Sequence, residues 1–241
     1  MCGRYQLKRE PGALADYFEA VSLVPNFPPS WNIAPTQDAP VLRLNPQTGE
    51  RQLNMLRWGL VPHWAKDAEG AARLMNARSD GIADKPSFRE AFRKRRCLVP
   101  MDGFYEWQAE GQGGGKSRQA FAVALRDGSP MAVAGLWEGW KRPDGEWLRT
   151  FTIITVESAG RQAQIHPRMP AILPPELWDA WLGAEPAEPD ELLGLLEPCP
   201  DEELAFWPIS ARVGKFSEND PGLLARVAAD VPAALNDEPV M

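Results

Sequence analysis

The stretch CLVPMDGFYEW, residues 97–107, predicts a β-strand that is interrupted at Gly103. Further strand candidates follow it, separated by Asp-Gly and Pro-Asp-Gly turn signals, at 119–125, 131–140 and 147–156. Consecutive strands joined by short turns pair antiparallel. This half of the chain therefore predicts an antiparallel sheet.

The remaining segments add strands and short helices to this sheet. Strands are expected at 39–44, 52–60 and 204–210. Helices are expected at 13–20 and at 87–95, where Ser87 and Glu90 fit a capping box. Two more are expected at 174–182 and 189–196, and each of these begins with a proline. We therefore predict an α+β fold: one compact domain over 1–241, with a mostly antiparallel, barrel-like β-sheet and flanking short helices.

The composition is that of an ordinary globular protein, with 44% hydrophobic and 24% charged residues among 241. The apolar runs are too short for a transmembrane helix, and the N-terminus has no apolar signal region. We therefore expect no membrane contact and a cytoplasmic location. A glycine-rich hairpin loop at 111–116 lacks the spacing of a phosphate-binding loop.

The formal net charge of −7 by itself argues against a nucleic-acid partner. The charge is unevenly spread, however, because Met169 to Ala211 holds ten acidic residues and no basic one. Without that stretch the formal charge is +3, so the remainder of the chain can present a basic face. The alternative for the acidic stretch itself is a solvated helical surface.

Cysteine and histidine are sparse. The three cysteines stand at 2, 97 and 199, and the two histidines at 63 and 166. CxxC, HxxxH and HExxH patterns are absent from the sequence, so we expect no metal site, no cofactor and free thiols.

Cys2 directly follows the initiator methionine. Removal of Met1 would leave an N-terminal cysteine with an α-amine and a thiol on adjacent carbons. The pKa of an α-amine is about 7.7–8.0, so part of it is neutral at physiological pH, whereas a lysine amine near 10.4 is almost wholly protonated. Such an amine condenses with an aldehyde to a Schiff base, and the thiol then closes a thiazolidine ring. The alternative is a chance residue at a frayed terminus.

Three further residues are candidates for this chemistry. The Asn76 amide can orient an amine or a carbonyl, with a loop cap as the alternative. Glu106, between two aromatic residues, suits proton transfer if it is buried, whereas simple strand alternation places it in water. His166 is held between prolines in a loop and titrates in the range of general acid–base catalysis.

Other candidates are weaker. Arg78 and Arg168 are natural phosphate contacts. Trp58 and Trp64 are candidates for a base-stacking platform, although most of the ten tryptophans are expected in the core. For His63 a structural or surface role is expected.

Six segments together resemble the SRAP (SOS-response-associated peptidase) family of abasic-site-processing proteins. They are MCGR at 1–4, NIAPT at 32–36, WGLVP at 58–62, NAR at 76–78, GFYEW at 103–107 and HPRMP at 166–170. They occur in the family's order, and the resemblance covers residues 1 to about 215. Residues 216–241 are then a C-terminal extension.

The resemblance implies a DNA-repair enzyme. Cys2, exposed by autoproteolytic removal of Met1, would link covalently to the ring-opened sugar aldehyde of an abasic site in single-stranded DNA, with lyase activity through the Schiff base. Asn76 would position the amine and the sugar, His166 would assist ring opening, and Glu106 would transfer protons. The family's compact α+β, barrel-like fold agrees with the prediction above.

The resemblance also implies contacts to single-stranded DNA. We expect the protein to act as a monomer. Arg4, Arg78 and Arg168 would contact phosphates, and the regions of Pro35 and Trp64, together with Asn32, would line the DNA groove. The segment 209–215 lacks the asparagine-containing turn that is usual in the family, which puts a local contact there in doubt.

Two other functions compete. The first is an N-terminal-nucleophile cysteine amidohydrolase of the glutamine amidotransferase type, which also begins Met-Cys-Gly and uses the thiol to attack an amide. Glutaminase release of ammonia would identify it. The second is a non-catalytic single-strand binder that uses Trp and Arg side chains, which predicts salt-sensitive binding without a covalent product.

Overall fold

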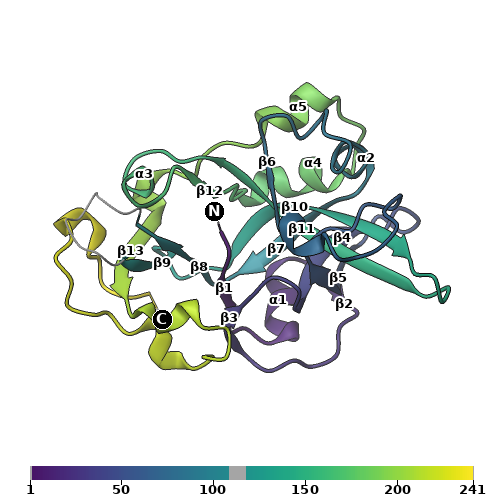
Figure 1. Ribbon diagram of the computed structural model, residues 1–241. Helices are drawn as coiled ribbons and strands as arrows, with labels where there is room; N and C mark the ends of the chain where they lie inside the picture. Colours follow the sequence, from purple (N-terminus) through teal and green to yellow (C-terminus); the bar gives the residue numbers. More distant parts are fainter. Residues whose placement is uncertain (1, 109–117, 241) are drawn as a thin grey trace.

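The stretch 97–107 joins two β-sheets in the computed structural model, which describes residues 2–108 and 118–240 (Figure 1). It forms two strands, β7 (Arg96–Met101) and β8 (Gly103–Trp107), in different sheets. A Cβ on Gly103 would lie 2.7 Å from the Val123 carbonyl oxygen and 2.8 Å from the Gln6 side chain, so only glycine fits there. The predicted interruption is therefore the point at which the chain changes sheets.

The smaller sheet has the strand order β13-β9-β8-β1-β3, and all of its pairs are antiparallel. Its other strands are β1 (Tyr5–Leu7), β3 (Ser30–Ile33), β9 (Ala120–Leu125) and β13 (Leu204–Ile209). This sheet carries the N-terminal segment next to β8.

The larger sheet has the order β12-β11-β10-β7-β4-β5-β2, with β6 beside β11. Its remaining strands are β2 (Ala20–Ser22), β4 (Asp38–Leu44), β5 (Arg51–Trp58), β6 (Asn76–Arg78), β10 (Met131–Lys141), β11 (Trp147–Glu157) and β12 (Arg168–Pro170). Because β5 also pairs with β11, in parallel at Trp58 and Phe151, the strands β11, β10, β7, β4 and β5 close into a barrel. The prediction of one α+β domain with a mostly antiparallel, barrel-like sheet is confirmed.

Short helices flank the sheets. The α-helices are α1 (Pro11–Tyr17), α2 (Arg89–Lys94), α3 (Gln162–Ile165), α4 (Trp178–Leu182) and α5 (Pro189–Gly194). The 3-10 helices are η1 (Ala71–Leu74), η2 (Pro175–Leu177), η3 (Asp201–Glu203), η4 (Ala211–Gly214), η5 (Pro221–Leu224) and η6 (Ala233–Leu235).

The predicted capping box at Ser87 is wrong. Helix α2 begins at Arg89 behind Phe88, which has no side-chain cap and whose N–H donates to the Lys85 carbonyl in a preceding turn. Burial of the Phe88 ring in the core fixes this start. A bond of the capping-box type occurs in α5 instead, where the Glu191 carboxylate accepts from the Glu188 N–H at 2.8 Å.

Aromatic side chains fill the interior between the sheets. Trp58 is fully buried, contacts the Tyr5 ring edge-on at 5.2 Å and stacks with Phe151 at 6.3 Å. Its indole N–H donates to the Met75 carbonyl. Trp58 is thus a core residue, and the suggestion that it forms a base-stacking platform is wrong.

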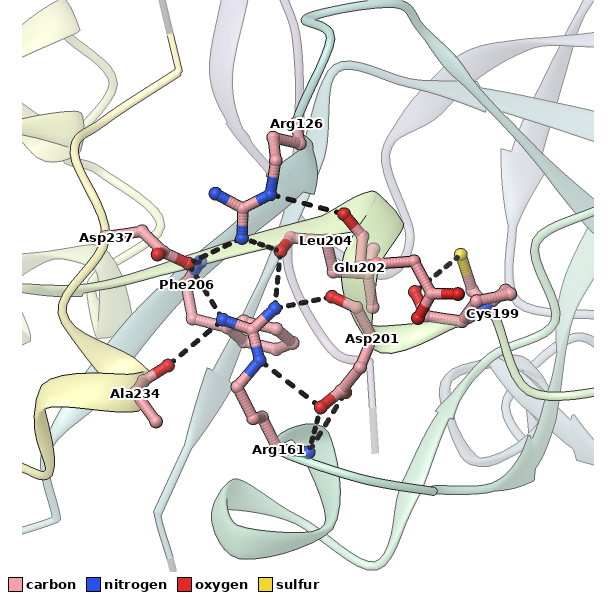
Figure 2. A network of polar contacts seen from close by, with 10 residues as sticks. Arg126, Arg161, Cys199, Asp201, Glu202, Leu204, Phe206, Ala234 and Asp237 are labelled. Carbon is pink, nitrogen blue, oxygen red and sulfur yellow. Dashed lines mark hydrogen bonds and ion pairs between the residues drawn. The ribbon is translucent and has the colours of Figure 1, made fainter.

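The C-terminal segment is tied to the domain by a charged network (Figure 2). Arg161, at the start of α3, contacts Asp237 at 3.1 Å and Asp201 at 3.2 Å, and Arg126 contacts the same Asp237 carboxylate at 3.2 Å. Leu235 is buried in the core. The expected loop at 111–116 lies outside the described residues. Within the described part of the chain, no helix has the length and apolar character needed to cross a membrane.

Candidate functional site

Cys2 is fully buried and is held by a residue from the other sheet. The Asn76 side-chain N–H donates to the Cys2 carbonyl at 2.8 Å. Asn76 begins β6, which pairs in parallel with β11 at Ile153 and is thereby fixed against the barrel. The Asn76 amide oxygen is also buried and has no hydrogen-bond partner among the described residues. The structure therefore places the Asn76 amide on the Cys2 carbonyl, while the predicted role of Asn76 in positioning the amine stays a prediction.

Glu106 reaches the same place from β8. Strand β8 pairs with β1 at Tyr5 and Phe104, and the Tyr105 N–H donates to the Arg4 carbonyl at 3.0 Å. Glu106, the next residue, is only 3% exposed, so the alternative of a solvent-facing side chain is wrong. Burial, and then the negative charge of Glu106, raise the pKa of the Cys2 thiol well above its usual value. The thiol is therefore protonated at neutral pH, with a carboxylate nearby.

His166 follows directly on α3, and its ring orientation is set by the backbone. Its Nδ1 lies 3.0 Å from both the N–H and the carbonyl oxygen of Arg168. The N–H can only donate, so that bond needs an unprotonated Nδ1 and leaves the proton of a neutral ring on Nε2. If Nδ1 carries a proton, the Arg168 carbonyl accepts it, so the Arg168 backbone can bond either to a protonated or to an unprotonated Nδ1.

The Gln108 amide donates to the Gln164 carbonyl at 3.4 Å and links the end of β8 to α3.

Arg78 and Arg168, two of the predicted phosphate contacts, share the carboxylate of Asp80. Arg78 lies 2.8 Å and Arg168 3.1 Å from Asp80. They come from β6 and β12, which flank β11 on its two sides at Thr155. Hydrogen bonding from Arg78 lowers the pKa of Asp80, which therefore stays ionised. The three side chains form a cluster with a net charge of +1.

Arg4 and Asn32 both contact the segment that follows β13. Arg4 donates to the Gly214 carbonyl at 3.2 Å and lies over the Phe216 ring. The Asn32 amide donates to the carbonyls of Val213, Lys215 and Glu218. Asn32 is 2% exposed, so it acts on this surface by holding the backbone in place.

The other predicted residues lie on two loops. Pro35 is half-buried and precedes Thr36, whose φ is 73° and whose N–H donates to the Trp58 carbonyl. Trp64 is 57% exposed. Its neighbour His63 contacts the buried Glu138 carboxylate at 2.8 Å, in agreement with the structural role expected for this histidine.

The structure thus brings the N-terminal segment together with β6 and β8. Strand β12 lies on the other side of β11 from β6. Two residues that contact the candidate site residues, Asp80 and Tyr5, were not identified from the sequence. Asp80 stands two residues after Arg78, a spacing that suits a local ion pair. Tyr5 is fully buried, and burial and then the neighbouring Cys2 raise its pKa well above its usual value. Strand alternation gave no signal for that contact.

Comparison with known proteins gives the class of this fold and site. Residues 1–216 match the model of the SOS response associated peptidase (SRAP) family. The chain belongs to the SRAP family, as its motifs indicated.

Individual relatives agree with this assignment. The chain is 35% identical over 226 residues to the abasic site processing protein YoqW of Bacillus subtilis, an alignment that covers 93% of this chain and 99% of the relative. It is 33% identical to the abasic site processing protein HMCES of Gallus gallus, covering 86% of this chain and 68% of the relative. A crystal structure of a Bacteroides thetaiotaomicron protein superimposes with a TM-score of 0.83 at 27% identity, covering 94% of this chain and 100% of that one.

Proposed function

We propose that this protein repairs DNA by processing abasic sites, and that it traps them covalently through Cys2 in single-stranded DNA. The observation that supports this most is the burial of Cys2 between the Asn76 amide and the Glu106 carboxylate. The names of the relatives, which describe abasic site processing, support the same substrate. We expect the protein to act as a monomer in the cytoplasm, on DNA of the nucleoid.

The chemistry begins with the amine, because the thiol is protonated where it lies. Hydrolysis of the Met1–Cys2 bond consumes one water and frees the α-amine of Cys2; Met1 itself lies outside the described residues. The amine adds to the C1′ aldehyde of the ring-opened sugar, and loss of one water gives an imine. The thiol sulfur then adds to the imine carbon while its proton passes to the nitrogen, which closes the thiazolidine.

Each neighbouring side chain has a role in this sequence. Asn76 holds the Cys2 backbone and offers its buried amide oxygen to the amine or to a sugar hydroxyl. Glu106 accepts a proton from the thiol or the amine and returns it when the crosslink reverses. His166 donates a proton to the sugar ring oxygen as the ring opens. From the imine, loss of a proton from C2′ and departure of the 3′ phosphate constitute a lyase reaction.

The DNA strand is held by the basic and aromatic residues around this centre. Arg4, Arg78 and Arg168 contact phosphates, and Pro35 and Trp64 line the path of the strand. Asn32 contributes indirectly, by holding residues 213–218 beside Arg4.

The test is a denaturing gel of the protein mixed with a single-stranded oligonucleotide that carries one abasic site. The wild type is expected to form a heat-stable adduct without a reductant. Cys2→Ala keeps an α-amine but has no thiol, so its adduct should appear only when borohydride reduces the imine. Cys199→Ala, which removes another buried cysteine, is the matched control. Equal adduct formation by Cys2→Ala without reductant would refute the mechanism.

Intact mass of the purified protein tests the removal of Met1. A chain that retains Met1 and still crosslinks normally would contradict the proposed role of the α-amine. Release of ammonia from glutamine would instead support the amidohydrolase alternative, for which a buried thiol with a raised pKa next to a carboxylate is poorly suited.

A further inference from the structure

A cavity of about 740 Å³ lies in the part of the chain that the proposed DNA chemistry does not use. It is lined largely by the acidic stretch between Met169 and Ala211, together with residues 125–132. Its volume lies within the range of about 300–1,000 Å³ that is typical of ligand sites. None of the residues assigned to the DNA site lines it.

The cavity has an apolar floor with a restricted backbone. Ile172, Leu173 and Trp178 are buried there, and Leu195 is partly buried. Five of the lining residues are prolines, which fix the backbone φ, at positions 130, 174, 175, 198 and 200. Because the backbone of this surface is already fixed, the protein loses little conformational entropy when a ligand binds.

The rim is strongly acidic. Five exposed carboxylates line the cavity, those of Asp127, Glu176, Glu197, Glu202 and Glu203. Arg126 is the only basic residue among its described lining residues. Arg126 is already bound to the carbonyls of Glu202 and Leu204 and to the Asp237 carboxylate (Figure 2). The rim therefore repels nucleic-acid phosphates and is complementary to a cation.

We propose that this cavity is the docking site for a peptide segment of a partner protein, one that inserts apolar side chains and places Lys or Arg against the rim. In sequence, the cavity adjoins a residue of the proposed DNA site: Ile172, which lines the cavity, comes two residues after the end of β12, and β12 carries Arg168.

The test selects phage-displayed random twelve-residue peptides on the immobilised full chain and then measures the affinity of the synthesised peptides. The expected peptides combine aromatic or aliphatic residues with Lys or Arg. Two altered proteins probe the site. Gly194→Trp adds a large side chain at a residue that lines the cavity, where a Cβ meets nothing within 4 Å. Glu176→Lys with Glu197→Lys reverses two rim charges. Each should weaken binding at least about tenfold.

The matched control is Glu146→Lys with Asp230→Lys, which makes the same change in net charge at exposed positions outside the cavity. It should leave the affinity within about twofold. Selection of peptides without basic residues, no saturable binding, or binding unaffected by Gly194→Trp would overturn the proposal. A wild-type dimer that Gly194→Trp dissociates in sedimentation would assign the cavity to a second copy and would equally overturn it. Abasic-site crosslinking by these variants is expected to be unchanged, so the two proposals fail independently.

Discussion

Asn76 and Cys2, 74 positions apart in the chain, are joined by a hydrogen bond of 2.8 Å from the Asn76 amide to the Cys2 carbonyl. The bond connects the two sheets, because Asn76 belongs to a strand beside β11 and Cys2 precedes β1. It fixes the backbone from which the thiol of Cys2 projects and, in the proposed mechanism, also its α-amine.

Asn76→Ala is expected to slow adduct formation by about ten- to a hundredfold, because a misplaced nucleophile loses most of its orientation advantage. The unfolding free energy should fall by only about 1 kcal/mol, the contribution of one hydrogen bond. Single-turnover crosslinking and denaturant unfolding measure the two effects. Asn54→Ala, which removes an amide bonded to Arg43 on β4, is the control. A large loss of stability with unchanged kinetics would contradict this assignment.

Glu106→Gln removes a negative charge while keeping the shape of the side chain. The pKa of the Cys2 thiol should then fall but stay above its usual value, because burial, the larger cause of its rise, remains and only the contribution of the carboxylate is lost. Crosslinking should nevertheless slow by about a hundredfold or more, since the proton acceptor is lost. The pH dependence of thiol alkylation and of crosslinking separates the two effects. Exposed Glu146→Gln is the control, and an unchanged crosslinking rate in Glu106→Gln would exclude the proton-transfer role.

Asp80→Asn releases Arg78 and Arg168 from their shared carboxylate and raises the local charge from +1 to +2. Non-covalent affinity for single-stranded DNA should rise, and its salt dependence should steepen. Arg78→Ala should do the reverse and reduce the slope of log affinity against log salt by about 0.7. Fluorescence anisotropy with an intact oligonucleotide, titrated with salt, measures both. If neither variant changes the salt slope, these arginines do not contact phosphates.

Asp237 makes stability depend on pH. Burial alone would raise its pKa, but the N–H of Phe206 and the Arg126 guanidinium outweigh burial and lower it. A carboxyl whose folded pKa lies below the unfolded value of about 3.9 contributes stability above that pH and loses it as pH falls through the folded pKa. The wild type should therefore lose more unfolding free energy than Asp237→Asn below about pH 4. Parallel curves of stability against pH for the two proteins would refute this.

Much of the secondary structure was predictable because local sequence patterns indicate it. Strand segments, turn dipeptides and proline starts placed the longer strands and helices α1, α2, α4 and α5 within a few residues. The strands of three or four residues, β1, β2, β3, β6 and β12, and helix α3 were not predicted. A barrel-like sheet was predicted, but the strands that close it were not, because the parallel pairing of Trp58 with Phe151 joins distant segments that carry no local signal of each other. The start of α2 was missed because burial of Phe88 outweighs the capping preference of Ser87.

By itself, the sequence determined which functional groups are available, because a thiol at position 2, an amide, a carboxylate and an imidazole are properties of residue type. The tertiary structure alone decided their environments. It buried Glu106 next to Cys2, paired Arg78 and Arg168 with Asp80, and turned Asn32 inward to hold residues 213–218. Which side chains are buried, and which strands lie close together, depends on how the two sheets meet at Gly103. No local sequence pattern specifies the residues that pack against Gly103 there.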